Sequence, residues 1–297
     1  MSKIVIIGSS NVDLTVRTAH IPSRGETIFG SDVKMAFGGK GANQAVAVSR
    51  LGGDASFITK VGADSYGNMM AENLLKEGMS ADTVIRDPHS PSGLAWICVD
   101  DNGDNTIIVM PGANGTMTVG DLEPYIPLIK DADYLLMQLE TPLDVVSYAA
   151  SLAYENGVKV VLNPAPAQPL PDALLAKVHI LTPNEKECRL LCSDAASDDV
   201  KANAEILRLK GVRNVIVTLG EKGSFLSGED GYKEVPAVRV DAVDTVAAGD
   251  TFSGALCVAL SEGHSMEEAM VFATKASAIS VTRFGAQPSV PYRHEIQ

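Results

Sequence analysis

Short apolar runs alternate with longer amphipathic segments along most of this chain. The runs are rich in Val, Ile and Leu and predict strands at residues 4–8, 56–61, 134–139, 158–163, 178–181 and 215–219. The segments between them have helical spacing and predict helices at 42–51, 66–77, 142–156, 201–210, 251–262 and 266–283. Such alternation is typical of an α/β fold, in which helices cover a mostly parallel sheet.

Two stretches interrupt this alternation. Residues 11–37 contain no convincing helix and are extended at 12–16 and 27–29. Residues 93–110 predict a hairpin with its turn at 101–104. We infer a small antiparallel sheet, built from two insertions, that projects from a large α/β unit. Such a sheet can close over a ligand as a lid or pair with another subunit.

Composition and charge exclude several classes of protein. The 297 residues carry a net charge of −13, with a pI near 4.8, which argues against a nucleic-acid partner because that would require a basic face. No run approaches the ~20 apolar residues of a membrane span. The apolar run near the N-terminus, Ile4–Ile7, is too short and wrongly flanked for a signal peptide. We therefore expect a cytoplasmic protein with no membrane partner.

Small residues lead directly into an apolar helix at Asp244–Ala255. A helix that begins in a glycine-containing loop offers free backbone N–H groups and the positive end of its dipole, and therefore an anion site. Asp250 places a carboxylate beside that site. Phosphoryl transfer needs such a base, because the attacking hydroxyl must lose its proton. The plainer alternative is that Asp250 only caps the helix.

Glycines also open an earlier helix, at Phe37–Ala45. This is not a Walker A loop, because Gly41 follows Lys40 where that motif has Ser or Thr. The glycines instead suit the close approach of a small polyhydroxy ligand, unless they form a plain loop. Hydrogen bonds to such a ligand are expected from the polar residues Asn11, Asp13 and Asn43.

Gly38–Asn43, with Gly52 and Gly62, resembles the N-terminal signature of the ribokinase-like (PfkB) carbohydrate kinases. Asp244–Ala255 resembles their C-terminal signature, and the similarity runs essentially from end to end. The connecting segments resemble the family members that phosphorylate ribose more than those acting on fructose or adenosine. The resemblance implies a three-layer αβα sandwich with a mostly parallel central sheet and a small β-sheet lid, inserted at about 11–37 and 93–110 in one domain of residues 1–297.

The same resemblance implies ATP-dependent phosphorylation of D-ribose at O5, giving D-ribose 5-phosphate, with Mg²⁺ and an activating K⁺. Asp250 would be the base, and the backbone of Ala247, Ala248 and Gly249 would form the anion hole. The implied sugar ligands are Asn11, Asp13, Gly39, Lys40, Asn43, Glu140 and Asp250. The implied nucleotide site comprises Asn184, Thr218, Leu219, Gly220, Glu221, Lys222, Gly223, Gly249 and Thr274. The implied K⁺ site comprises Asp244, Val246, Ser280, Arg283, Gly285 and Ser289, mostly through backbone carbonyls, and Glu187 would act indirectly on Mg²⁺.

Plainer alternatives stay open for several of these residues. Glu140 could be a solvated loop acid, Asn184 a helix cap, Glu187 a surface acid, Arg283 the partner of an acidic neighbour, and Trp96 part of the lid surface or a subunit contact. Two rival functions also stay open, namely a kinase for deoxyribose, fructose or adenosine, and a non-catalytic sensor of sugar or nucleotide. We expect a homodimer formed through the lid.

Overall fold

Residues 2–229 and 231–296, which the computed structural model describes, contain a nine-stranded sheet and a separate four-stranded sheet. The large sheet has the order β13-β12-β11-β10-β9-β8-β1-β4-β5. Its strands are β1 (Lys3–Ile7), β4 (Asp54–Gly62), β5 (Val84–Asp87), β8 (Tyr134–Met137), β9 (Lys159–Leu162), β10 (Ile180–Leu181), β11 (Asn214–Thr218), β12 (Ser224–Gly228) and β13 (Gly231–Val235). Pairing is parallel from β5 to β11 and antiparallel from β11 to β13. The expected α/β class with a mostly parallel sheet is confirmed.

Helices cover both faces of this sheet, because side chains alternate along each strand. Ile4 and Ile6 of β1 join a core with α1, α8 and α9, whereas Val5 and Ile7 join a core with α3, α4 and α7. The helices are α1 (Lys40–Arg50), α2 (Ser65–Lys76), α3 (Ile126–Lys130), α4 (Leu143–Glu155), α5 (Asp172–Leu175), α6 (Glu185–Leu191), α7 (Val200–Leu209), α8 (Ala248–Ser261) and α9 (Met266–Ser280). Short 3-10 helices span Gly112–Thr116, Val119–Tyr125, Ser193–Ala195, Gly220–Lys222, Gln287–Ser289 and Arg293–Glu295. In the described ranges, none of the helices has the length and apolarity to cross a membrane.

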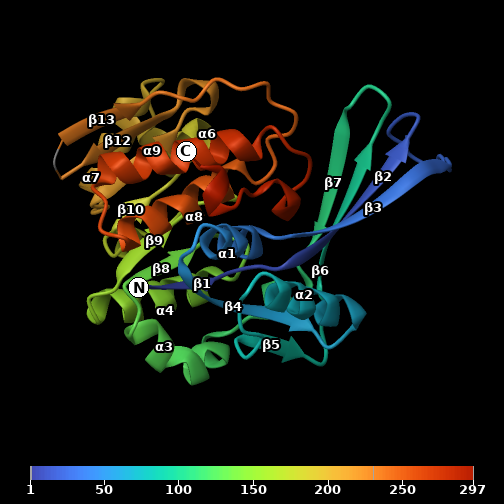
Figure 1. The fold of residues 1–297 in the computed structure, drawn as a ribbon, viewed down its shortest axis with the longest axis horizontal. Helices are drawn as coiled ribbons and strands as arrows, with labels where there is room; N and C mark the ends of the chain where they lie inside the picture. The colour runs from blue at the N-terminus through green and yellow to red at the C-terminus, as the bar shows by residue number, and fades with distance from the viewer. Residues whose placement is uncertain (1, 230, 297) are drawn as a thin grey trace.

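The four-stranded sheet projects away from this layered body (Figure 1). Its order is β3-β2-β6-β7, with β2 at Asn11–Thr18, β3 at Gly30–Gly38, β6 at Gly93–Val99 and β7 at Asn105–Met110. Each hairpin is antiparallel, but the central strands β2 and β6 pair in parallel, so the expected wholly antiparallel sheet was wrong. Both central strands leave the body in the same direction, since Asn11 is opposite Gly93 at their first residues.

Several local predictions also differ from the structure. Residues 27–29 are not a strand: β3 begins at Gly30, and Phe29 is 97% exposed. The pattern of β-forming side chains misled here because strand formation requires a pairing partner, and these residues have none in the described sheets. The predicted helix at 266–283 ends at Ser280. The strands β5, β12 and β13 and the short helix α6 were not predicted.

Candidate active site

The candidate site residues gather at the carboxyl ends of the parallel strands. Ligands bind at this edge in open α/β sheets, because loops and helix N-termini converge there. Asn11 follows β1, Glu140 follows β8, Asn184 follows β10 and Thr218 ends β11. Residues far apart in the sequence are thereby brought to one edge.

Helix α8 begins at this edge with an open N-terminus. Its N-cap residue Ala247 has a left-handed backbone with φ 60°, and no side chain caps the helix. Within residues 2–229 and 231–296, the backbone N–H groups of Gly249 and Asp250 donate to no acceptor. The small side chains and the unpaired N–H groups make this turn suitable for an anion.

The Asp250 carboxylate lies in the first turn of α8 but does not cap it. Both of its oxygens accept hydrogen bonds from α1, Oδ2 from Asn43 Nδ2 at 2.9 Å and Oδ1 from Gln44 Nε2 at 2.9 Å. Asp250 is only 4% exposed, so the two amide donors compensate for much of its lost hydration. The anion-binding turn and the glycine-rich loop before α1 therefore meet at one carboxylate.

The loop before α1 is held tightly against the end of β1. Gly39 has φ 87°, and a Cβ there would lie 2.9 Å from the Cα of Ser10 and from the backbone nitrogen of Asn11. A larger residue would clash, which explains the glycine. The Asn11 side chain is fixed in turn by Asn114, whose Nδ2 donates to Asn11 Oδ1 at 2.8 Å.

Glu140 supports the same loop. Its Oε2 accepts from the backbone N–H of Lys40 at 2.9 Å and from Ser9 Oγ at 2.5 Å. The side chain is half-buried, so it is not the solvated loop acid that the sequence left open. Its position lets it orient the first turn of α1 at the site.

Asp13 contributes a second carboxylate from β2. Its oxygens lie where a Cβ of Gly38 would be, 2.1 Å from that position, so Gly38 makes room for the carboxylate. Burial and the nearby negative charge of Glu140 raise the pKa of Asp13 to about 6. A half-buried carboxylate that forms no ion pair with the described residues is well suited to accept hydrogen bonds from a polyhydroxy ligand.

Lys40 is the cation closest to these acids. Burial by itself would lower the pKa of Lys40, but the negative charges of Asp250, Glu140 and Glu187 raise it above the ordinary value. Lys40 therefore stays protonated at neutral pH and offsets part of the negative charge at the site.

A cleft of about 1070 Å³ opens beside the anion-binding turn. It is lined by residues of the predicted nucleotide site and anion hole, namely Thr218, Gly220, Glu221, Lys222, Gly223, Ala248, Gly249 and Thr274. The buried Thr274 hydroxyl has no hydrogen-bond partner in the described part of the chain. Residues 237–242 also line the cleft and were not predicted. The cleft is large enough for a nucleotide whose phosphates would point toward α8.

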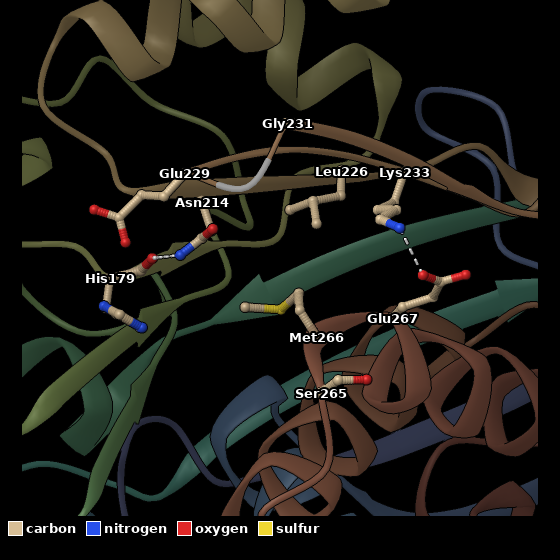
Figure 2. A pocket seen from close by; sticks show the side chains of 9 residues that line it. All are labelled: His179, Asn214, Leu226, Glu229, Gly231, Lys233, Ser265, Met266 and Glu267. Atoms are coloured by element: carbon tan, nitrogen blue, oxygen red, sulfur yellow. Dashed lines mark hydrogen bonds and ion pairs between the residues drawn. The ribbon is translucent and has the colours of Figure 1, made fainter.

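A second cavity, of about 430 Å³, lies at the opposite end of the sheet (Figure 2). It is lined by His179 and Asn214, which lie at the amino-terminal ends of β10 and β11, and by Lys233 and Glu267, which form an ion pair at 2.9 Å. Its described lining contains none of the predicted site residues.

The sequence model of the pfkB family carbohydrate kinases matches residues 1–293. The chain belongs to this family. A ribokinase of Haemophilus influenzae is 42% identical over 98% of this chain and 96% of its own length. A deoxyribokinase of Salmonella typhi is 38% identical over 97% of this chain and 95% of its own length. The structure of an Arabidopsis thaliana ribokinase complexed with ribose and ATP superposes with a TM-score of 0.92, at 32% identity over 99% of this chain and 97% of that chain.

Membership in the pfkB family confirms the resemblance and the three-layer fold with its smaller sheet. The protein is an ATP-dependent sugar kinase. The match covers both glycine-rich segments, the one that leads into α1 and the one that leads into α8.

In this kinase, Asn184 and Glu187 form a capping box at the start of α6. Asn184 Oδ1 accepts from the backbone N–H of Glu187 at 2.9 Å, and Glu187 Oε2 accepts from that of Asn184 at 2.9 Å. Burial raises the pKa of Glu187 above its ordinary value, although these bonds and the charge of Lys40 oppose the shift. Asn184 is thus a helix cap, which agrees with the plainer alternative left open by the sequence. Glu187 lies close enough to Asp250 for their negative charges to repel each other.

The segments expected to bind a monovalent cation also meet in this kinase. Asp244 accepts from the backbone N–H of Val246 at 3.0 Å and from that of Gly285 at 2.9 Å. Arg283 is paired with Glu295 at 2.5 Å, which agrees with the alternative left open for its side chain. Among the described residues, no hydrogen bond reaches the backbone oxygens of Asp244, Val246 and Gly285. No described cluster of three or more His, Cys, Asp or Glu side chains is arranged to hold a metal ion.

Four buried amides of the site were assigned no role from the sequence. They are Gln44, Asn114, Gln138 and Asn163, and each hydrogen-bonds at the strand ends. Gln44 follows the predicted sugar ligand Asn43 directly, which was the one available signal.

Proposed function

We propose that this kinase transfers the γ-phosphoryl group of ATP to O5 of D-ribose, with Asp250 as general base. The observation that carries the proposal is the position of the Asp250 carboxylate. It is buried in the first turn of α8, beside unpaired backbone N–H groups, and is bonded to Asn43 in the first turn of α1. A base between an anion site and a polyhydroxy site is what phosphoryl transfer to a hydroxyl requires.

In the proposed step, Asp250 accepts the proton of the sugar O5 hydroxyl as O5 forms a bond to the γ-phosphorus. The bond from that phosphorus to the bridging oxygen breaks, leaving ADP. The unpaired backbone N–H groups of Gly249 and Asp250 would donate to the phosphoryl oxygens as charge develops on them. Thr218–Gly223 and Thr274 would contact the nucleotide in the adjoining cleft.

Ribose is the sugar that the site and the relatives favour together. Asn43 donates to Asp250 through Nδ2, and its buried Oδ1 has no partner among the described residues, so a sugar hydroxyl can supply the missing donor. Asp13 can accept hydrogen bonds from vicinal hydroxyls. Relatives named ribokinase, one of them complexed with ribose and ATP, support this choice.

Both proposed cations suit the oxygen groups that are present. The carbonyl oxygens of Asp244, Val246 and Gly285 are free to coordinate K⁺, a hard cation that takes oxygen ligands. The bound ion would add positive charge beside the anion-binding turn. Glu187 keeps its Oε1 free of the capping box and would hold water on the Mg²⁺ of the nucleotide.

The projecting sheet would act as a lid and as a dimer interface. Asp13 lies on one face of β2, and the strand register places Leu14, Met35, Trp96 and Ile108 in one row on the opposite face. Met35 and Trp96 are each 43% exposed, and Ile108 is 58% exposed. A second copy of the chain would cover this apolar row while the Asp13 face closes over the sugar.

The role of Asp250 is tested by Asp250→Asn. We expect kcat to fall by roughly 10²–10⁴ because proton acceptance is lost, while ribose still binds. ADP release gives the rate, and calorimetric titration with ribose gives the affinity. Turnover near the wild-type rate would refute the assignment.

The same ADP-release assay separates the rival functions. Ribose, deoxyribose, fructose and adenosine are compared at equal concentration, each with and without K⁺. We expect ribose to give the highest kcat/KM and K⁺ to raise it. A higher value with deoxyribose would transfer the assignment to that sugar, and no turnover with any acceptor would favour a sensor.

A further inference from the structure

Gln44 is a fully buried polar residue of the site. Its side chain has no exposed surface and makes three hydrogen bonds. Nε2 donates to Asp250 Oδ1 at 2.9 Å and to Asn163 Oδ1 at 3.1 Å, and Oε1 accepts from Gln138 Nε2 at 2.6 Å. Both N–H donors of this buried amide and its oxygen are thus engaged by protein partners.

The direction of these bonds is set by a backbone group. Asn163 Nδ2 donates to the carbonyl oxygen of Thr182 at 2.9 Å, and a carbonyl can only accept. Asn163 must therefore turn its Oδ1 toward Gln44, which must donate in return. The amide group of Gln44 then faces Asp250 with its nitrogen, and its oxygen faces Gln138.

This chain of amides orients the Asp250 carboxylate. If Gln44 were turned around, its oxygen would oppose Asp250 Oδ1 and Gln138 would lose its acceptor, so the alternative orientation leaves buried polar atoms unpaired. Gln44 therefore holds one carboxylate oxygen while Asn43 holds the other. Each oxygen retains a second lone pair for the proton of the acceptor hydroxyl.

We propose that Gln44 is a positioning residue that aims the carboxylate of Asp250, and that Gln138 and Asn163 determine the orientation of the Gln44 amide. This inference rests on the proposed role of Asp250 as base. Gln44 acts through Asp250, since both of its N–H donors and its oxygen already bond protein partners and the side chain has no exposed surface. Losing the bond would let the carboxylate rotate, and a displacement of about 1 Å can lower a rate by roughly 10²-fold.

The test compares Gln44→Met, Gln138→Met, Asp250→Asn and the double variant Gln44→Met/Asp250→Asn. We expect Gln44→Met to lower kcat by roughly 10- to 100-fold and to change the KM for ribose by less than about 3-fold. Gln138→Met should lower kcat less, because the Gln44 donor remains in place. Asn203→Leu is the matched control: the Asn203 side-chain amide is also buried, bonds only the backbone of Ser197 among the described residues, and lies in α7, which packs in the core on the other face of the sheet from α8. It should lower the melting temperature and leave kcat within about 2-fold.

The double variant separates this inference from the base assignment. If Gln44 acts through Asp250, adding Gln44→Met to Asp250→Asn lowers the residual rate no further. An unimpaired Gln44→Met enzyme beside an inactive Asp250→Asn enzyme would overturn the positioning role and leave the base in place. A full additional loss in the double variant would also overturn it. An active Asp250→Asn enzyme would overturn the proposed function itself. If Gln44→Met does not fold, an unchanged kcat for Gln138→Met is the refuting result.

Discussion

The Asp13 carboxylate can accept hydrogen bonds from a sugar, but its ionised form lowers the free energy of unfolding. Its carboxyl has a pKa of about 6 in the folded protein because it is buried near Glu140, whereas the ordinary value is 3.8. The folded state therefore binds this proton more tightly than the unfolded state. The contribution of Asp13 to the free energy of unfolding becomes less favourable as pH rises from about 4 to about 6, and that cost is fully present at pH 7.

We predict that ribose binding weakens as pH falls through about 6, because protonated Asp13 loses its capacity to accept two hydrogen bonds. The dissociation constant measured by calorimetry should rise between pH 7 and pH 5. Asp13→Asn should bind ribose poorly at every pH, and its unfolding free energy at pH 7 should increase by about 1–2 kcal/mol because a buried charge is removed. A wild-type affinity that is constant over this range would contradict the role given to Asp13.

At the scale of elements, the helix N-termini fall into two kinds. Helices α2, α7 and α9 begin with side chains that cap them, from Asp64, Asp199 and Ser265. Helices α1 and α8 begin at the site with Gly39 and Ala247 and have no side-chain cap. The unpaired N–H groups of Gly249 and Asp250 in α8 are therefore available to a ligand, whereas the first N–H groups of α1 already donate to Ser9 and Glu140.

The start of α1 gives a prediction at this scale. Gly39→Ala should be destabilising by about 1–3 kcal/mol, because φ 87° is unfavourable for alanine and the new Cβ would contact Ser10 and Asn11. We also expect a higher KM for ribose, since Asn11 would be displaced. Chemical denaturation and ADP-release kinetics measure the two effects. Gly52→Ala is a matched control: Gly52 has a similar φ of 89° but open space around it, so only stability should fall.

At the scale of the whole molecule, Met35, Trp96 and Ile108 in the apolar row of the lid stay exposed and do not pack into the core of the layered body. Trp96 and Ile108 are opposite each other on β6 and β7, and both are exposed. We predict that Ile108→Lys converts a dimer to a monomer at micromolar concentration. Ile107→Lys, at a similarly exposed position on the other face of β7, should leave the dimer intact. Sedimentation velocity distinguishes the two, and a dimeric Ile108→Lys protein would refute the lid interface.

Local patterns in the sequence were sufficient to predict six of the nine strands of the large sheet, the six longest helices and the two loops at the site. Side-chain periodicity reports which face of an element is buried, and glycine before a helix reports a close backbone approach. Both signals depend on neighbours within a few residues. They were insufficient for α6, which has only seven residues, and for β12 and β13, in which Gly, Ser, Lys and Glu outnumber the apolar residues. They also failed at residues 27–29, which have suitable side chains but no partner strand.

The sequence by itself therefore determined the layered α/β fold and the placement of Asp250 in the first turn of a helix that starts with small residues. Only the tertiary structure decided what Asp250 does there. Its partners Asn43 and Gln44 lie 207 and 206 residues away, and they meet it because α1 packs against α8 on one face of the sheet. The parallel pairing of β2 with β6 was decided in the same way, since no local pattern specifies which distant strand a strand will meet.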